Sequence, residues 1–320
     1  MSPVRVGVIG LGLIGGSIAQ RLAQLREQYE VRGFDTDGEQ RYNITLASAE
    51  QALAQWAELV VVAVPPEHTA SVIAAVLAAN HNALVTDVAS VKAPIVERVQ
   101  ADRDRYLPAH PLAGAEHSGW HSARPDLLDT TTWAVCPSHP DAPAEPLCRW
   151  AAVFDAFDAR LVVCDPKEHD AAVARTSHAP HLAASVIAAS LDGGEAKLAA
   201  ALSGGAFRDM TRVARSDPSL WSKILQLNRD QVAAVLDDWI ARLERMGGAG
   251  DLERGRAMAE LVEQRRWQAP AWEKRSFDWP AWEELKALGR EGVAVRRLKR
   301  ESGRLSAEVA SWQTSAPWPT

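Results

Sequence analysis

Two segments of the chain hold residues suited to the oxidation of a hydroxyl group. His110 begins the segment HPLAGAEHSGW, His110–Trp120, directly after a short run that predicts a strand. A glycine-rich segment, VGVIGLGLIGG at Val6–Gly16, lies upstream. A neutral imidazole can accept a hydroxyl proton near pH 7, and a dinucleotide can accept a hydride. The two segments therefore predict a hydride-transfer site with His110 as its base. The alternative is a histidine that only satisfies backbone groups beside Pro111.

The glycine-rich segment has the spacing of a dinucleotide fingerprint. Gly10, Gly12 and Gly15 form GxGxxG between a predicted strand and a predicted helix. Such glycines permit a tight turn, close approach of the backbone to a pyrophosphate, and close packing of helix on strand. Glycines kept for packing alone are the alternative. Asp35 lies 20 residues past Gly15, the spacing of a carboxylate that binds ribose hydroxyls.

The carboxylate of Asp35 also bears on which dinucleotide binds. It would repel the 2′-phosphate of NADP and therefore favours NAD, with Arg41 as the residue that would accommodate NADP. The predicted cofactor-binding residues are Gly10, Gly12, Leu13, Ile14, Gly15, Asp35, Val64, Pro65 and Asp87.

The elements around these segments alternate between strands and helices. Near-continuous β-branched runs separated by helical patterns predict a parallel sheet covered on both faces, a doubly wound Rossmann-type α/β domain. The predicted strands are Val4–Ile9, Val31–Phe34, Leu59–Val64, Ala83–Val88, Tyr106–Ala109, Thr132–Cys136 and Arg160–Val163.

The pattern changes after Val163. From Asp165 to Arg266 helical periodicity dominates, and Asp217-Pro218 predicts a helix start, because Asp caps free N–H groups and Pro suits the first helical position. We therefore expect a dinucleotide-binding domain at 1–163, an all-helical substrate and dimerisation domain at 164–274, and a Trp-rich extension at 275–320.

The C-terminal extension is the least regular part of the sequence. Residues 267–320 hold six of the twelve tryptophans and a basic cluster at Arg296–Arg300. A docked extension, a basic amphipathic helix and membrane-surface binding are alternatives. We favour a poorly tied-down terminus whose aromatic side chains pack on a partner subunit.

Composition excludes several classes of function. A net charge of −6, from 35 basic and 41 acidic residues, argues against nucleic-acid binding, which needs a basic face. The N-terminus lacks the pattern of a signal peptide, and no run approaches 18 apolar residues, so we expect a cytoplasmic protein that spans no membrane. Cys136, Cys148 and Cys164 lack CxxC spacing, which favours reduced thiols over a disulfide or a metal site.

Five segments in order along residues 4–265 resemble the prephenate/arogenate dehydrogenase family of tyrosine biosynthesis. They are GLGLIGGS, DVASVK, HPLAGAEHSG, SHAPH and GGAFRDMTRVARSDPSLW. The resemblance implies an NAD-dependent oxidative decarboxylation. A cyclohexadienol that bears a ring carboxylate and a pyruvyl or alanyl side chain would lose hydride and carbon dioxide and become aromatic. It also implies a homodimer formed by the helical domain.

The resemblance gives roles to residues of these motifs. His110 matches the catalytic histidine, and Ser90 matches a serine that contacts the reacting hydroxyl, although it could also be a helix N-cap. Arg212 matches a carboxylate-binding arginine, since a guanidinium can bind a carboxylate through two hydrogen bonds. His181 matches a substrate-contacting histidine. Lys92 is expected as a solvated charge near the site.

Further substrate-binding candidates follow from the same motifs, with weaker support. Gly205 and Trp221 match positions that line the pocket, and Glu116 matches an ion-pairing carboxylate in part of the family. Ser118 falls near a position where relatives that prefer arogenate carry an acid, so its neutral side chain favours prephenate. Arogenate, or both substrates, is the close alternative. A different reductase on the same plan and an NAD-sensing protein without turnover are more distant ones.

Overall fold

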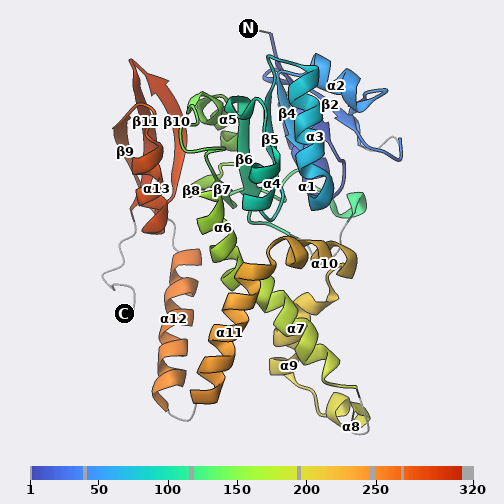
Figure 1. The fold of residues 1–320 in the computed structure, drawn as a ribbon, viewed down its shortest axis with the longest axis vertical. Helices are drawn as coiled ribbons and strands as arrows, with labels where there is room; N and C mark the ends of the chain where they lie inside the picture. The colour runs from blue at the N-terminus through green and yellow to red at the C-terminus, as the bar shows by residue number, and fades with distance from the viewer. Residues whose placement is uncertain are drawn as a thin grey trace.

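The computed structural model describes residues 2–38, 42–114, 119–192, 196–245, 249–267 and 270–311. Figure 1 shows three parts. The first is an α/β sheet region that contains the N-terminus, the second is a helical region below it, and the third is a group of C-terminal strands beside the first. Within the described parts of the chain, no helix is long and apolar enough to cross a membrane.

The first part is the predicted Rossmann-type sheet. The strand order is β3-β2-β1-β4-β5-β6, and all five of these neighbouring pairs are parallel. The chain reverses its direction of travel between β1 and β4, which places the ligand crevice at the carboxyl ends of these strands. The elements are β1 (Val4–Ile9), α1 (Leu13–Gln24), β2 (Tyr29–Phe34), β3 (Thr45–Leu46), α2 (Glu50–Trp56), β4 (Leu59–Val62), α3 (Pro66–Ala79), β5 (Leu84–Asp87), α4 (Ala93–Arg98) and β6 (Tyr106–Pro111).

Beyond β6 the sheet is no longer uniformly parallel. β7 (Thr132–Val135) pairs antiparallel with β6 and parallel with β8 (Arg160–Val163), and α5 (Glu145–Asp155) connects β7 to β8. The pairing places His110 opposite Ala134, so β6 continues through Pro111. His110 therefore lies within a strand, whereas the sequence predicted that the strand ends at Ala109. The partner strand β7 was predicted, but its antiparallel pairing with β6, which supplies the extra ladder bonds, was not.

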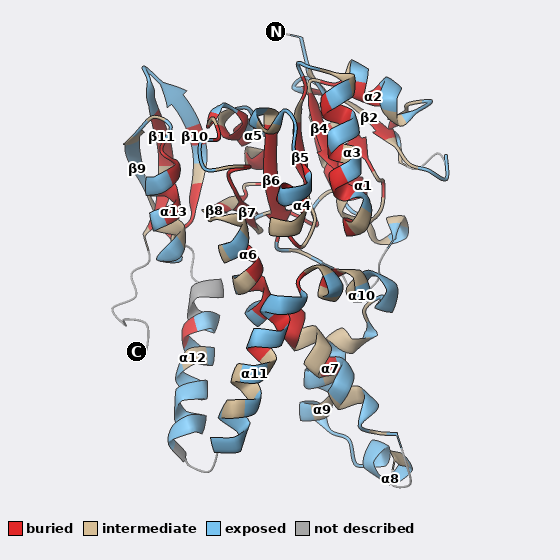
Figure 2. Cartoon of the chain, in the orientation of Figure 1, coloured by how far each residue is buried: buried red, intermediate tan, exposed pale blue. Residues whose placement is uncertain are grey.

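The second part is helical, as predicted, but it has little core of its own. Figure 2 shows mostly exposed and intermediate residues there. Among its described residues the buried apolar ones are few: Val173, Ala174, Ala179, Ala184, Ile224, Val232, Val235 and Leu261. Asp217 caps α10 as predicted, accepting a 2.9 Å hydrogen bond from the Ser219 N–H. The elements are α6 (Pro166–Val173), a π-helical turn (Ala174–His178), α7 (Ala179–Ala189), α8 (Ala196–Ala201), α9 (Gly205–Thr211), a 3₁₀ turn (Arg212–Arg215), α10 (Pro218–Leu227), α11 (Arg229–Arg245) and α12 (Ala249–Trp267).

The third part corrects the expectation of a poorly tied-down C-terminus. β9 (Ala271–Asp278), α13 (Trp282–Arg290), β10 (Val295–Glu301) and β11 (Arg304–Ser311) extend the sheet to eleven strands. β10 pairs antiparallel with β8 at Val295 and Leu161. Buried Trp282, Leu285 and Leu305 belong to the same core as Trp150, and Trp282 Nε1–H donates to the Ala142 carbonyl at 2.9 Å. The basic cluster is paired rather than free, since Arg296 and Arg300 contact Asp158 and Glu145.

The docked C-terminus predicts a stability effect that an untethered tail would not show. Leu285 is 1% exposed, so Leu285→Ala should lower the free energy of unfolding by about 2–5 kcal/mol, through lost burial and a residual cavity. Glu284→Ala, at the exposed neighbouring position of α13, is the control and should change it by less than about 0.5 kcal/mol. Urea denaturation measures both. Equal, small effects would show that the segment does not pack on the core.

Candidate active site

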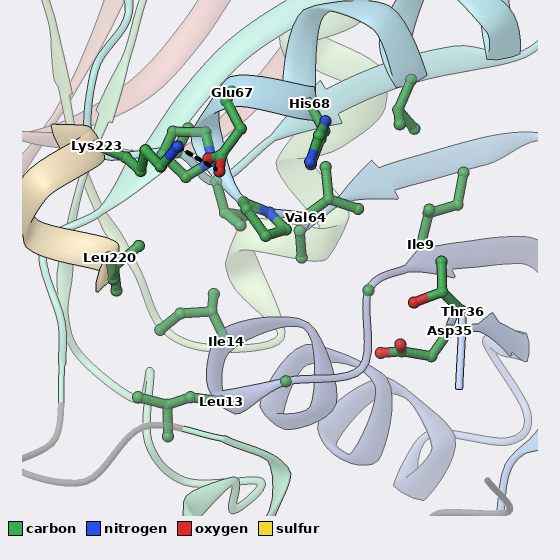
Figure 3. A pocket seen from close by; sticks show the side chains of 18 of the residues that line it. Ile9, Leu13, Ile14, Asp35, Thr36, Val64, Glu67, His68, Leu220 and Lys223 are labelled. Carbon is green, nitrogen blue, oxygen red and sulfur yellow. Dashed lines mark ion pairs between the residues drawn. The ribbon is translucent and has the colours of Figure 1, made fainter. Parts of the chain in front are cut away.

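A pocket of about 900 Å³ lies at the carboxyl ends of the parallel strands. Figure 3 shows Leu13 and Ile14 of α1 and Asp35 after β2 on its walls. Helix α10 closes it from the helical region, where Lys223 makes a 3.6 Å ion pair with Glu67 of α3. The predicted residues that line it are Gly10, Gly12, Leu13, Ile14, Asp35, Val64, Pro65 and Ser90.

The glycines of the fingerprint divide into two structural roles. Gly10 has φ +91°, and a Cβ there would lie 2.4 Å from the Ala63 carbonyl oxygen. A Cβ on Gly15 would lie 2.0 Å from the Gly10 carbonyl oxygen, so both are required by packing. A Cβ on Gly12 would meet nothing within 4 Å, which leaves room beside the start of α1 for a bound pyrophosphate. Asp35 Oδ2 accepts a 2.7 Å hydrogen bond from the Leu11 N–H, which fixes the carboxylate at the pocket wall.

Asp87 and Lys92 form a buried pair beneath the pocket. Both side chains are fully buried, and Lys92 Nζ donates to Asp87 Oδ1 and, at 2.7 Å, to the Ala109 carbonyl next to His110. Tyr106 donates its hydroxyl to Asp87 Oδ2 at 2.5 Å. The Asp87 carboxylate is thus bonded by protein groups, and Asp87 is not among the residues that line the pocket, so its contact with the cofactor stays a prediction. Lys92 is likewise buried, whereas the sequence suggested a solvated charge.

His110 is held by a second buried histidine. His110 Nδ1 lies 3.0 Å from His169 Nε2, and His169 Nδ1 lies 2.8 Å from Asp170 Oδ1. His169 and Asp170 are both on α6. Asp170 in turn accepts hydrogen bonds from the backbone N–H groups of Lys92, at 2.8 Å, and Ala93, at 2.9 Å. The Asp170 carboxylate on α6 is therefore linked through the His169 imidazole to the His110 imidazole on β6.

This chain of contacts fixes where the protons lie. Both Asp170 oxygens receive backbone donors, so the carboxylate acts as the acceptor and His169 donates through Nδ1. A neutral His169 then has an unprotonated Nε2, which can only accept from His110 Nδ1–H. Neutral His110 is left with its lone pair on Nε2. That tautomer is the one a general base requires.

Electrostatics keep His110 neutral. Burial, followed by the nearby His169, Lys92 and His178, holds the pKa of His110 well below its usual value. Burial also lowers the pKa of His169, although Asp170 opposes that shift. Burial and Asp87 raise the pKa of Tyr106 well above its usual value, so its hydroxyl remains a donor.

A second group of predicted residues meets around α7 and α10. The rings of His181 and Trp221 stack with centroids 3.5 Å apart, and His181 Nδ1 lies 2.9 Å from the Ser177 carbonyl. Burial, and to a lesser extent Arg212, lowers the pKa of His181, which places Arg212 near this ring. Arg212 is exposed and begins a 3₁₀ turn, so it does not continue the helix that carries Arg208. The segment before Pro180 forms a π-helical turn, Ala174–His178, which ends two residues before that proline.

His178 connects the two groups. Its Nδ1 lies 3.0 Å from the Asn228 side-chain nitrogen, which also donates to the Asp170 carbonyl at 2.8 Å. Asn228 therefore donates to His178 Nδ1, and neutral His178 has its proton on Nε2. Within the described residues, that buried Nε2 has no hydrogen-bond partner. Burial lowers the pKa of His178 to about 4.

The remaining predicted residues lie at the edges of the site or outside the described structure. Ser90 lines the pocket, and it is not the N-cap of α4, because Lys92 occupies that position. Gly205 is exposed at the first residue of α9. Glu116 and Ser118 lie outside the described residues.

The sequence did not reveal the residues that orient His110. His169 and Asp170 lie 59 and 78 residues from their partners His110 and Lys92. The available clue was the polar pair itself, two adjacent titratable residues one turn into a helix that starts at Asp165-Pro166. Asn228 offered no comparable clue.

Family models match the chain in two consecutive ranges. The nucleotide-binding domain of prephenate dehydrogenase matches residues 19–163, and the prephenate dehydrogenase dimerization domain matches residues 165–264. The prephenate dehydrogenase of Bacillus subtilis is 28% identical over 251 residues, which are 74% of this chain and 67% of that protein. The cyclohexadienyl dehydrogenase of Zymomonas mobilis is 30% identical over 254 residues, 75% of this chain and 86% of that protein.

Solved structures agree with these matches. A Corynebacterium glutamicum protein superposes with a TM-score of 0.81 at 27% identity, covering 91% of this chain and 98% of that one. Prephenate dehydrogenase from Aquifex aeolicus, in complex with hydroxyphenyl propionate and NAD⁺, has the same fold at 24% identity, with a TM-score of 0.70 over 83% of this chain and 96% of that one. Fold and site define a nucleotide-dependent oxidoreductase. The chain belongs to the prephenate dehydrogenase family, which confirms the predicted family and fold class.

The proton positions predict a distinctive set of histidine titrations. Long-range ¹H–¹⁵N spectra of protein labelled at histidine should show His110 protonated at Nδ1 only at pH 7, because His169 accepts that proton. His110 should remain neutral well below pH 6.5, and His178 should titrate near 4. His110→Asn and His178→Asn assign the signals. A His110 proton on Nε2, or its titration above pH 6.5, would contradict the arrangement.

Proposed function

We propose that this protein catalyses the NAD-dependent oxidative decarboxylation of prephenate to 4-hydroxyphenylpyruvate. One observation supports this most directly: His110, neutral and with Nε2 unprotonated, is held by His169 in the region that also contains the dinucleotide pocket. In this reaction the substrate hydroxyl proton goes to His110 Nε2. The carbinol carbon loses a hydride, carbon dioxide leaves, and the ring becomes aromatic. The chemistry that bound NAD supplies is the acceptance of that hydride.

Residues of the pocket fit NAD. The open space at Gly12 and the start of α1 suit a pyrophosphate, and Asp35 suits the ribose hydroxyls. Asp35 would repel a 2′-phosphate, so NAD is preferred over NADP. Val64 and Pro65, after β4, would contact the dinucleotide from the opposite wall, and Ser90 would contact the nicotinamide and the reacting hydroxyl.

The helical residues suit a dianionic substrate. Arg212 would bind a carboxylate through its guanidinium, and the stacked His181 and Trp221 would form the adjacent wall. His178 offers a buried Nε2–H for a substrate oxygen. Glu116 and Ser118 follow β6 in the sequence; a neutral Ser118 would leave a substrate ammonium without a partner and therefore favours prephenate. Arogenate is the alternative, and the similarity to a cyclohexadienyl dehydrogenase keeps dual specificity open to test.

Lys92 contributes to the site through its charge. The ammonium is fully buried and bonded to the Ala109 carbonyl, one residue before His110. A fixed cation there opposes protonation of His110 in the free enzyme and keeps the base ready. Its pairing with Asp87 compensates the burial of the charge.

The helical region also supports a homodimer. Nine of the ten exposed large hydrophobic residues in the described structure lie between Val186 and Val262, on or beside α7–α12. Such a concentration of exposed apolar side chains marks an interaction surface. We assign this surface to a second copy of the chain, because the dimerization-domain model matches residues 165–264. With this assignment the chain divides into a dinucleotide-binding domain at 1–163, a dimerisation domain that follows it and a C-terminal extension. We place the start of the extension at 271 rather than at the 275 expected from the sequence, because β9 begins at Ala271.

The test of the reaction is NADH formation at 340 nm with prephenate or arogenate, each with NAD or NADP. We expect turnover with prephenate and NAD. His110→Asn should lower kcat by about 100-fold or more while NAD still binds, since general base catalysis contributes about 10²–10⁴-fold. His81→Asn, at an exposed position, is the matched control and should leave turnover unchanged. Preference for arogenate would overturn the substrate assignment, and full activity of His110→Asn would overturn the mechanism.

The dimer predicts a change of mass on charge insertion. Ile240 and Leu243 of α11 are 55% and 66% exposed and three residues apart, so they share one side of the helix. The double variant Ile240→Asp/Leu243→Asp should convert a dimer to a monomer in light scattering, because two buried carboxylates would lack partners. Ala75→Asp, at an exposed position of α3, should leave the mass unchanged. A monomeric parent protein would refute the homodimer.

A further inference from the structure

The C-terminal module, which we define as residues 271–311, lies outside both ranges that match the family models. None of its residues lines the dinucleotide pocket, and none takes part in the hydrogen bonds around His110. Its helix α13 nevertheless contacts the point where the sheet region leads into α6. That junction carries His169 and Asp170.

Two cations of α13 bind the two acids at the start of α6. Lys286 Nζ donates to Asp165 Oδ1 at 3.0 Å. Arg290 Nε donates to Glu168 Oε1 at 2.7 Å, and its Nη2 lies 3.3 Å from Asp165 Oδ2. Asp165 is the N-cap residue of α6, and Glu168 accepts a 3.0 Å hydrogen bond from the Asp165 N–H. The ion pairs therefore act on the residues that set where and how α6 begins.

The backbone of α13 also packs directly on this junction. A Cβ added to Gly289 would lie 1.9 Å from the carbonyl oxygen of Val163, the last residue of β8. Only two residues separate Val163 from the start of α6 at Pro166. Helix α13 thus contacts the end of the strand and the beginning of the helix at once.

The residue that follows Glu168 is His169, whose Nε2 lies 3.0 Å from His110 Nδ1. Within one helical turn the backbone is rigid, so a shift at Asp165 or Glu168 moves His169 by a similar amount. We propose that α13 is a positioning element of the catalytic site: Lys286 and Arg290 hold the start of α6 so that His169 and Asp170 orient His110. The proposal rests on the function proposed above to the extent that His110 is the base.

The alternative is that these ion pairs only stabilise the fold. Exposed salt bridges contribute about 0–1 kcal/mol each, and the Arg290 side chain is half exposed, although Lys286 is buried. The module provides its own control, because Arg297 and Arg300 of β10 bind Asp158 and Glu145, away from α6. Removing either pair of positive charges, Lys286 and Arg290 or Arg297 and Arg300, changes the net charge equally and removes ion pairs of the same module.

The experiment compares Lys286→Gln/Arg290→Gln with Arg297→Gln/Arg300→Gln in the full-length protein. We expect kcat with prephenate and NAD to fall about tenfold in the first variant only, because sub-ångström misplacement of a catalytic group lowers rates by one to two orders of magnitude. The dissociation constant for NAD should stay within about twofold, since Gly12 and Asp35 are untouched. Lys286→Arg should keep full activity.

Two further readouts separate positioning from stability. Amide hydrogen exchange of residues 167–173 should accelerate in the first variant and not in the control. The acid limb of the kcat profile should move to higher pH. His110 is faced by His169 from α6, Lys92 before α4 and His178 before α7, and burial together with these groups lowers its pKa. Displacement of His169 and entry of water would raise the pKa of His110 again. Lys286→Arg, which keeps the positive charge, should show the same profile as the parent protein.

Each outcome decides the proposal. Equal exchange and equal kcat in both double variants would overturn it and leave α13 a stabilising helix. If the first variant does not fold, Arg290→Gln alone, at the half-exposed cation, replaces it with the same expectations at a smaller size. If the parent protein turns over neither prephenate nor arogenate, the proposed function fails, and the exchange comparison still tests the hold on α6.

Discussion

The contact between His110 Nδ1 and His169 Nε2 is the interaction on which the rest of the arrangement depends. It joins a strand of the sheet region to the first helix of the helical region, and it determines which nitrogen of His110 is free. For this contact to form, α6 must start at a fixed place relative to β6. Asp170 secures one side of that requirement, because its carboxylate accepts from the backbone of Lys92 and Ala93 at the start of α4. Asn228 adds a bond from α10 to the Asp170 carbonyl.

The buried polar groups around this contact form one connected network. Unpaired buried charges are strongly destabilising, and pairs are tolerated only when their remaining donors and acceptors are satisfied. Asp87 receives Lys92, Tyr106 and the Ala89 N–H, and Lys92 also donates to Ala109. A network of this kind contributes more to the uniqueness of the arrangement than to its stability. The network meets His110 at two points, the Ala109 carbonyl that Lys92 binds and the His169 ring, so the buried charges lie next to the proposed base.

The sequence predicts the local part of this structure well. The glycine fingerprint, Asp35 and the cap at Asp217 each depend on residues within one turn or one βαβ unit. The hold on His110 could not be predicted, because its partners are supplied by a helix 59 residues away. The burial of Lys92 was missed for a different reason: Asp87 is only five residues away, but the pair is enclosed only when β5 and β6, which carry Asp87 and Ala109, lie side by side.

The C-terminal strands were missed for another reason. A half-buried strand is recognised by alternation of apolar and polar residues. In β10 that alternation is interrupted, because the register with β11 shifts between Arg296 and Lys299, and Arg297 has φ +54°. The two buried side chains, Val295 and Leu298, are therefore three residues apart and resemble a helical spacing. The remaining clue was Ser302-Gly303, both with positive φ, which forms the turn between β10 and β11.

The sheet region and the helical region differ in how many apolar residues they bury. The sheet region and the C-terminal module share one large core, which holds β6 and therefore His110 in a rigid frame. The helical region buries few apolar residues and exposes many, so a single copy cannot order it as firmly. The residues proposed to contact the substrate, His181 and Trp221, lie on the helical region, while the proposed base His110 and its partner His169 lie where that region joins the sheet. The contacts of α13 with the start of α6 thus link the large core directly to the helix whose His169 orients His110.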